Sequence, residues 1–296
     1  MHIPVLLNEA TEALQIIPNE WYIDATFGRG GHTGRLLSLG AKVVAFDVDQ
    51  EAITFGHQQF AEVMERGQLI LINENFSHIK SVIELLQTRN QVQKIHGALF
   101  DFGTSSDQLL SLDRGFSFDS QSELDMRMDQ RLGVKAIDLL KLIDEKQLAQ
   151  AFAELGGEHE AKSVARALKN YVRTHSDAGD LTAAQLAEVI VKTKHEHRAK
   201  LHPATKVFQA LRMLVNSELE AINQGLPEVR PLIQPGGRIV TIAFHEGEDR
   251  IIKQLFADWE RQQLGKRINK EVIIPSSEEE AENPRARSAK MRIFEV

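Results

Sequence analysis

Short apolar runs that alternate with amphipathic helical patterns constrain the fold of this chain more than any other feature. The runs occupy residues 21–24, 42–47, 68–73 and 97–101, and each closes on a polar or glycine-rich turn. Between them, apolar residues recur with the 3.6-residue period of a helix. Strands that alternate with helices pair in parallel, so we expect an α/β fold with a doubly wound sheet. Such sheets bind ligands at the carboxyl ends of their strands.

The pattern changes to helices without strands after about residue 103. Apolar stripes run through residues 148–155 and 161–172, and Thr182 with Gln185 forms a capping box before a third helix. One long helix is expected from Pro203 to Ile222, and strands return only at 238–244 and 291–296. We therefore predict a Rossmann-like core made of residues 1–106 and 206–296, interrupted by an inserted helical domain at 107–205. The acidic stretch 276–282 is expected to be a solvated loop.

Composition excludes several classes of protein. The chain is 42% hydrophobic and 26% charged, and no apolar run approaches the roughly 20 residues that span a bilayer. Its first residues resemble neither a signal peptide nor a transit peptide, so a cytoplasmic location without a membrane partner is expected. The net charge of −7 argues against a uniformly cationic surface for nucleic acid. Basic residues do cluster locally, either as solvated helix faces or as an RNA groove: Lys162, Arg166, Lys169 and Arg173; Lys192, Lys194, Arg198, Lys200 and Lys206; Arg285, Arg287, Lys290 and Arg292.

A glycine-rich loop follows the first strand, in the segment DATFGRGGH at residues 24–32. Glycines permit a tight turn and a close approach of the backbone to a ligand. The dinucleotide fingerprint needs a glycine at its sixth position, but Thr33 stands there when counting starts at Gly28. Asp47 ends the second strand, 19 positions after Gly28, where a carboxylate can accept hydrogen bonds from ribose hydroxyls. These residues favour an adenosine ligand, with a purely structural turn and an NAD-dependent oxidoreductase as alternatives.

The fourth strand distinguishes between the adenosine ligands. It ends at Asp101 and is followed by Thr104, Ser105 and Gln108, which supply hydroxyls and an amide. A nitrogen that attacks a sulfonium methyl must turn its lone pair toward the carbon, and acceptors for its N–H groups do that. The segment fits methyl transfer, although a capped loop is the alternative. The absence of cysteine removes the thiolate nucleophile of cytosine C5 methylation, which favours direct transfer to nitrogen.

Segments along nearly the whole chain resemble the RsmH (MraW) family, ribosomal RNA small-subunit methyltransferase H. They are HIPVLLNE, DATFGRGGH, DFGTSSDQL, RGFSF with LDMRMD, HPATKVFQALR, GGRIVTIAFHEGEDR and ENPRARSAKMR, in the family's order. The chain departs from the family's usual DLGVSSPQL at Phe102, Thr104 and Asp107, and from FHSLEDR at Glu246 and Gly247. Asp107 adds a negative charge beside the expected RNA entrance.

The resemblance implies an S-adenosylmethionine-dependent class I methyltransferase that methylates N4 of a cytidine in the decoding region of 16S rRNA. Its partner would be small-subunit rRNA, in an assembled or assembling subunit, and the insert would recognise the RNA. A non-catalytic RNA-binding assembly factor is the alternative. Carried over by position, the cofactor contacts are Gly30, Gly31, His32, Asp47, Phe76, Asp101 and Gln108.

Other residues are candidates for the substrate side of the site. We expect Asp101 and Ser105 to position the amine, with Asp125, His245 and Arg250 as weaker candidates. The run His195-Glu196-His197 is expected to lie on a solvated helix, and no metal site is expected.

Overall fold

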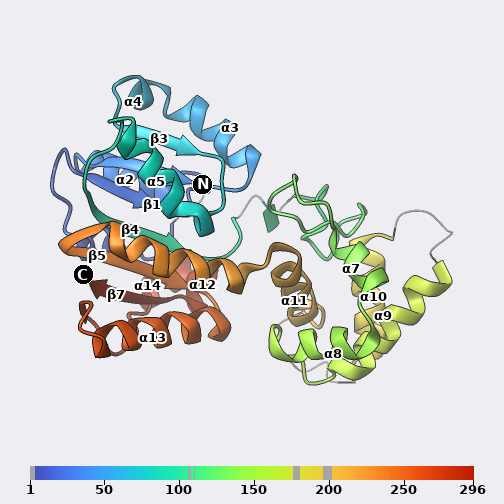
Figure 1. The fold of residues 1–296 in the computed structure, drawn as a ribbon. Helices are drawn as coiled ribbons and strands as arrows, with labels where there is room; N and C mark the ends of the chain where they lie inside the picture. The colour runs from blue at the N-terminus through green and yellow to red at the C-terminus, as the bar shows by residue number, and fades with distance from the viewer. Residues whose placement is uncertain (1–3, 106–107, 110, 176–180, 196–201) are drawn as a thin grey trace. The chain divides into compact units, whose positions relative to one another are not determined.

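The chain folds into two compact units, in a computed structural model that describes residues 4–105, 108–109, 111–175, 181–195 and 202–296. The first unit contains the residues up to Gly103 together with Leu219–Val296, and the second is Thr104–Glu218. Figure 1 shows strands only in the first unit among the labelled elements and helices in both. No helix in the described residues is long and apolar enough to cross a membrane.

The first unit is built on a seven-stranded sheet in the order β3-β2-β1-β4-β5-β7-β6, counted over the described residues. The strands are β1 (Trp21–Asp24), β2 (Lys42–Phe46), β3 (Leu69–Ile72), β4 (Ile95–Asp101), β5 (Ile233–Ala243), β6 (Lys266–Arg267) and β7 (Lys290–Glu295). The strands from β1 to β5 pair in parallel, whereas β7 is antiparallel to both of its neighbours. The predicted Rossmann-like α/β fold is therefore confirmed. All the parallel strands end at one edge, where ligands of such sheets bind.

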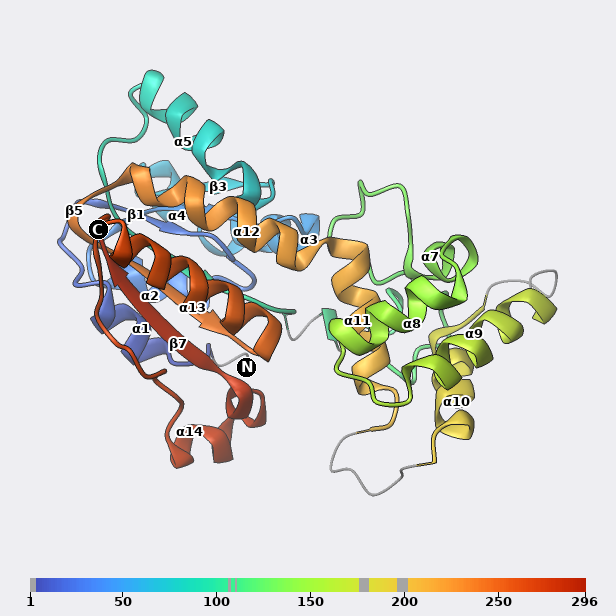
Figure 2. The same cartoon turned by 60° about the horizontal axis from the view of Figure 1, so that its bottom comes forward.

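Helices cover both faces of this sheet. One face packs against α5 (Ile79–Thr88), α12 (Glu218–Val229) and α13 (Glu246–Arg261). The other face packs against α1 (Leu7–Ala13), α2 (Gly31–Ser38) and α3 (Gln50–Gln59). Figure 2 shows α12 and α13 side by side over the sheet. The shorter elements are α4 (Ala61–Glu65), η1 (Phe76–His78), η2 (Arg230–Leu232), α14 (Ser277–Glu282) and η3 (Pro284–Ser288).

The second unit is helical and has its own apolar core. Its described helices are α7 (Ala136–Leu142), α8 (Glu145–Glu154), α9 (Ala161–His175), α10 (Ala183–Thr193) and α11 (Thr205–Asn216). The predicted capping box is present, because Thr182 Oγ1 accepts the N–H of Gln185 and the Gln185 side chain accepts the N–H of Thr182. Apolar residues of all five helices pack together with Phe116, Leu124 and Met126 from the preceding loop.

The expected long helix from Pro203 to Ile222 is two helices instead, α11 and α12, separated at Ser217. Ser217 has left-handed backbone dihedrals, with φ 47° and ψ 42°. The preceding Asn216 directs its side chain into the unit, where it accepts the N–H of Met128 and donates to the carbonyl of Met126. These tertiary contacts override the apolar periodicity that runs through the break. The buried face of α11 belongs to the core of the second unit, so the unit boundary lies at 218/219 and not at the expected 205/206.

The acidic stretch 276–282 forms a helix and not the expected loop. Residues Ser277–Glu282 form α14, whose N-cap Ser276 accepts the N–H of Glu279 at 3.1 Å. A serine followed by glutamates in the first turn is a favourable helix start, because the carboxylates complement the helix dipole.

Candidate active site

The loop between β1 and α2 forms the centre of the candidate site in the first unit. Gly28 and Gly30 have positive φ values of 53° and 70°, which favour glycine. A Cβ at Gly30 would also collide with the rings of Phe27 and Phe60. Gly30 caps α2, and Gly31 is its first residue. The turn thus places the N-terminus of α2, with backbone N–H groups that lack partners within the helix, at the carboxyl edge of the sheet.

Asp47, at the end of β2, is tied to this loop. Its Oδ2 accepts the N–H of Gly28 at 2.7 Å, and its Oδ1 accepts the N–H of Asp49 at 2.8 Å. Burial raises the pKa of Asp47 to about 6, against the opposing effect of these two hydrogen bonds. Each carboxylate oxygen can accept more than one hydrogen bond, so the two oxygens retain capacity for a ligand's hydroxyl groups.

His32 and Asp101 face one another across the same edge. His32 Nε2 lies 3.5 Å from Asp101 Oδ2, and only 5% of the His32 side chain is exposed. Both ring nitrogens of His32 and the Oδ1 atom of Asp101 are buried without a hydrogen-bond partner. Buried polar atoms in folded proteins are normally hydrogen-bonded. The structure therefore presents an unsatisfied polar cluster beside the N-terminus of α2, as a polar ligand would require.

Asp24, which is not among the residues predicted for the site, lies close enough to His32 and Asp101 to interact electrostatically with both. Its Oδ2 accepts the hydroxyl hydrogen of Thr33 at 2.7 Å, and its Oδ1 accepts the N–H of Thr26. Thr26 in turn accepts the backbone N–H of Asp101 at 2.8 Å, which links β1 to β4. In the sequence, the only indication of a role for Asp24 is its position at the start of the DATFGRGGH segment.

The pKa values of Asp24 and His32 are both raised, so both side chains hold a proton more readily than usual. Burial raises the pKa of Asp24, a shift that nearby His32 partly offsets. Burial lowers the pKa of His32, but the carboxylates of Asp101, Asp24 and Glu279 outweigh that effect and leave it raised overall. The cluster is thus suited to hold a cationic His32 beside anionic Asp101.

Phe76 follows β3 and is partly exposed. Its ring meets Phe100 edge-on at a centroid distance of 5.6 Å, and Phe102 at 5.7 Å. Gly225 of α12 lies so close that a Cβ there would collide with Phe76. The departure at Phe102 is explained by this aromatic packing, in which it is buried.

Ser105 and Gln108 belong to the second unit, where they cap each other. Gln108 Oε1 accepts the N–H of Ser105 at 3.1 Å, and Ser105 Oγ accepts the N–H of Gln108 at 3.2 Å. Gln108 is buried and Ser105 is half-buried. Thr104 accepts a hydrogen bond from Arg212. Asp107 lies outside the described residues.

Asp125, also in the second unit, is engaged by Arg127. Two parallel contacts of 2.6 and 2.8 Å join the carboxylate to the guanidinium. Burial raises the pKa of Asp125, but the Arg127 hydrogen bonds outweigh burial and lower it overall. The same loop is held by buried Arg114, which donates to the carbonyls of Arg127 and Met128. Asp125 is therefore a paired anion that organises its loop, which makes it a weak proton acceptor.

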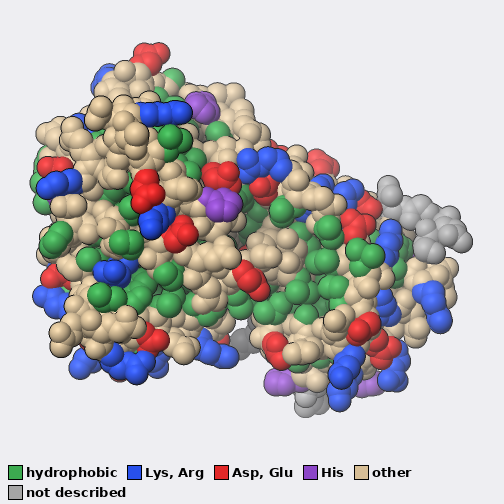
Figure 3. Space-filling model, viewed as in Figure 1, with side chains coloured by type: hydrophobic (Ala, Val, Ile, Leu, Met, Phe, Trp, Pro, Cys, Tyr) green, Lys and Arg blue, Asp and Glu red, His purple; other side chains and the backbone are tan. Residues whose placement is uncertain are grey.

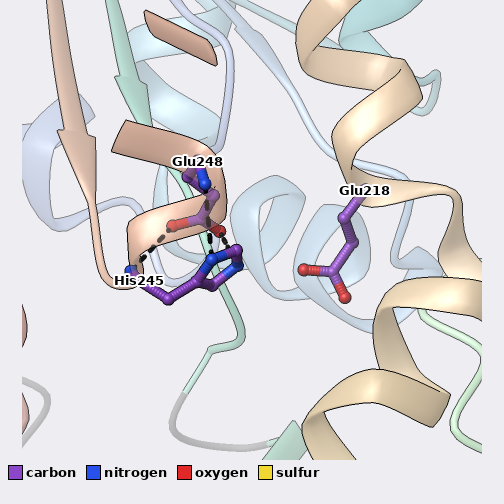
Figure 4. Close-up of side chains that lie close together, drawn as sticks. All are labelled: Glu218, His245 and Glu248. Carbon is purple, nitrogen blue, oxygen red and sulfur yellow. Dashed lines mark hydrogen bonds and ion pairs between the residues drawn. The ribbon is translucent and has the colours of Figure 1, made fainter. Parts of the chain in front are cut away.

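His245 is the N-cap of α13. Its Nδ1 accepts the N–H groups of Gly247 and Glu248 at 3.1 and 3.3 Å, so the proton of the neutral ring lies on Nε2. In turn, Glu248 Oε2 accepts hydrogen bonds from the backbone N–H groups of Phe244 and His245. Figure 4 shows this reciprocal cap. Glu218, drawn in the same figure, is ion-paired with Arg212 within the second unit at 2.7 Å.

The remaining residues singled out from the sequence differ in their exposure and in their partners. Arg250 is exposed on α13, and Glu246 is exposed and ion-paired with Lys290. Of the run His195-Glu196-His197, only His195 is described, and its N–H donates to Glu160. In the predicted basic clusters, the partly buried Lys194 is ion-paired with the buried Glu158, and Lys206 donates to the carbonyl of Gly157. Arg198 and Lys200 lie outside the described residues.

Comparison with known proteins gives a match over the whole chain. A family model described as the MraW methylase family matches residues 1–296. Ribosomal RNA small subunit methyltransferase H of Anaeromyxobacter dehalogenans is 39% identical over 313 residues, covering 99% of this chain and 97% of that protein. The enzyme of the same name from Coprothermobacter proteolyticus is 36% identical over 295 residues, covering 99% and 95%. Among solved structures, an rRNA methylase from Streptococcus thermophilus covers 100% of this chain and 98% of its own, with a TM-score of 0.47 and 11% identity. On its sequence, this chain belongs to the MraW methylase family.

Proposed function

We propose that this protein transfers a methyl group from S-adenosylmethionine to the N4 amine of a cytidine in the decoding region of 16S rRNA. The observation that carries the proposal is the buried, unsatisfied polar pair His32 and Asp101 at the carboxyl edge of a methyltransferase-type sheet. The relatives are named ribosomal RNA small subunit methyltransferase H, which supports rRNA as the substrate.

The residues of the first unit fit the parts of this donor. Asp47 would accept hydrogen bonds from the ribose hydroxyls, and Phe76 would cover the adenine face. His32 and the N–H group of Gly31 suit the donor's carboxylate, because a helix N-terminus favours anions. The N–H of Gly30 already donates to the carbonyl of Phe27 at 2.7 Å, so Gly30 would contribute through its backbone conformation. The carboxylate of Asp101 suits the donor's ammonium group, which carries the opposite charge. Gln108 stays a proposed donor contact on the strength of the family resemblance. The donor supplies an electrophilic methyl group on a sulfonium sulfur.

The reaction needs an oriented amine more than a strong base. We assign Asp101 and Ser105 to accept hydrogen bonds from the amine's N–H groups, which directs the nitrogen lone pair toward the methyl carbon. The N–C bond forms as the S–C bond breaks, and the nitrogen then releases its extra proton to solvent or to Asp101. The chain contains no cysteine, so this direct transfer has no competing thiolate route. Asp125 and His245 keep structural roles in our proposal, because their hydrogen bonds are used within the fold.

The second unit would bind the RNA. Lys162, Arg166 and Arg173 are exposed on α9. In Figure 3, Lys and Arg side chains over α8 and α9 are interspersed with acidic ones, so the positive surface is local. A second feature is the stacked pair Phe118 and His202, with ring centroids 4.4 Å apart and His202 exposed. Exposed rings of this kind stack on unpaired RNA bases.

The test is mass mapping of modified nucleosides in small-subunit rRNA from cells with and without the protein. We expect one N4-methylated cytidine to disappear with the gene and to return when purified protein and donor are added to the subunits. A methyl group on C5 or on a ribose oxygen would contradict the proposal. A thermal shift with NADH but none with S-adenosylhomocysteine would instead favour the oxidoreductase, and donor binding without any methyl transfer would favour a non-catalytic assembly factor.

A further inference from the structure

The backbone of Leu6 is strained and is held by a residue far away in the sequence. Leu6 is completely buried, yet its φ of 52° and ψ of 35° lie in the left-handed region. That conformation costs a non-glycine residue free energy and persists only where surrounding contacts enforce it. Glu279 supplies such a contact, because its Oε1 accepts the N–H of Leu6 at 2.7 Å across 273 residues of sequence.

Residues 4–6, the segment that contains Leu6, also pack against the candidate donor loop between β1 and α2. Pro4, two residues before Leu6, packs so closely on Gly31 that a Cβ at Gly31 would collide with its ring. Gly31 is the first residue of α2 and precedes His32. Any shift of residues 4–6 would therefore release the packing on the backbone that begins α2.

The sheet topology explains why Glu279 reaches this place. β7 is antiparallel to β5, and its first residue Lys290 pairs with Ala243 at the carboxyl end of β5. The segment just before β7, which contains α14, therefore lies at the ligand-binding edge of the parallel strands. Ser276 fixes the first turn of α14 by capping the N–H of Glu279 itself. The carboxylate of Glu279 also acts electrostatically on His32.

We propose that Glu279 is a positioning residue for methyl-donor binding: it latches residues 4–6 against the N-terminus of α2 and so holds Gly31 and His32 in their binding geometry. This inference rests on the proposed function, because it assigns the donor to that loop. The latch acts through packing and one hydrogen bond, and Glu279 itself touches neither the donor nor the acceptor.

The first experiment compares Glu279→Ala, which removes the acceptor, with Glu279→Gln, which keeps an amide oxygen in its place. We expect Glu279→Ala to raise the KM for S-adenosylmethionine about tenfold with kcat at saturating donor nearly unchanged, and Glu279→Gln to stay within about threefold of wild type. Glu278→Ala is the matched control, since Glu278 is a neighbouring exposed glutamate of the same helix. An unchanged KM in Glu279→Ala would overturn the latch, as would an equal defect in Glu279→Gln, which would assign the effect to charge alone.

The second experiment tests the physical route. Pro4→Ala removes the ring from Gly31 without altering Glu279, so it should weaken donor binding in the same direction. If both residues act through one latch, the double variant Pro4→Ala with Glu279→Ala should be little worse than the poorer single variant. Fully multiplicative effects would mean two independent contributions and would contradict the proposal.

The third measurement separates the latch from the proposed function. Hydrogen exchange at the Leu6 amide requires no donor or RNA, and it should accelerate at least tenfold in Glu279→Ala but not in Glu278→Ala. Unchanged protection would refute the latch whatever the enzyme does. Conversely, wild-type protein that protects Leu6 but binds no S-adenosylhomocysteine in calorimetry would refute the donor assignment, and with it the role of the latch in donor binding.

Discussion

His32 and Asp101 come from the two elements that flank the candidate donor site, and their side chains approach to 3.5 Å without forming a good hydrogen bond. His32 is the second residue of α2, and Asp101 is the last residue of β4. A cation and an anion so placed can bind the carboxylate and the ammonium of one zwitterionic ligand while each retains the other as a neighbour. This arrangement supports donor binding more directly than the glycine-rich turn does.

Replacing Asp101 should impair transfer more than donor binding. Asn keeps the size and one acceptor oxygen but loses the charge, so Asp101→Asn should lower the single-turnover rate at saturating donor at least ~10-fold, or about 1.4 kcal/mol. The measurement is transfer of labelled methyl to small subunits, followed by digestion to nucleosides. Asp113→Asn, at an exposed site, is the control. A near-normal rate would exclude Asp101 from the chemistry.

Asp47 should contribute mainly to affinity. Asp47→Ala removes the proposed acceptor for the ribose hydroxyls and should weaken donor binding by about 1.5–3 kcal/mol, as expected for hydrogen bonds to a charged group. It also leaves the N–H groups of Gly28 and Asp49 without their acceptor. Calorimetry with S-adenosylhomocysteine measures the loss, and unchanged affinity would refute the ribose assignment.

The raised pKa of Asp47, about 6, predicts a pH dependence of donor binding. Ribose hydroxyls donate better to the ionised carboxylate, so binding is linked to deprotonation. Affinity should rise as pH increases through about 6, and it should fall up to tenfold per pH unit below that value. His32 works in the opposite sense, since its pKa is raised and its cationic form favours a carboxylate, so affinity should fall again at higher pH. In Asp47→Asn the loss of donor affinity below about pH 6 should disappear. If affinity still falls there as it does in wild type, another group causes the fall.

The strands were predictable because their signals are local, and so was the position of Asp47 and Asp101 at strand ends. That these residues contact the donor stays a prediction. An apolar run that ends in Asp47 or Asp101 fixes the end of a strand, and parallel strands bring their carboxyl ends to one edge. The break at Ser217 was not predictable, because it depends on Asn216 reaching a loop about 90 residues away. The latch at Leu6 is equally nonlocal, as no pattern near Glu279 indicates its partner.

The hydrogen-bond partners of the substrate-side candidates were not predictable either, and a role of these residues in the reaction stays a prediction. His245 and Asp125 are residue types suited to chemistry, but whether such a side chain is available depends on its neighbours. The backbone of α13 uses one ring nitrogen of His245, and Arg127 occupies the carboxylate of Asp125. Sequence shows the functional group, and only the fold shows whether hydrogen bonds have already engaged it.

Within the basic cluster of α9, Lys169 is also engaged by hydrogen bonds within the fold. Its Nζ donates to the carbonyls of Leu140, Lys141 and Ile143, at 2.9, 3.0 and 2.7 Å, which lie at the C-terminal end of α7. A cation there satisfies carbonyls without helical partners and complements the helix dipole. We expect Lys169→Ala to lower the free energy of unfolding by about 1–2 kcal/mol. Urea denaturation measures the change, and wild-type stability would show that the three contacts contribute nothing.

Lys162 and Arg166 should instead bind RNA. Both are exposed one helical turn apart, and the ion pair of Arg166 with Glu145, at 3.2 Å, is exposed on both sides and so contributes little to stability. The double variant Lys162→Ala with Arg166→Ala should keep wild-type stability and donor affinity but bind small subunits more weakly, with a larger loss at low salt than at high salt. Each lost phosphate contact should flatten the slope of log affinity against log salt by roughly 0.7 to 0.9. The control is Lys253→Ala, an exposed lysine on α13. If the double variant retains wild-type RNA affinity at every salt concentration, this face of α9 is only solvated, and the RNA must bind another surface.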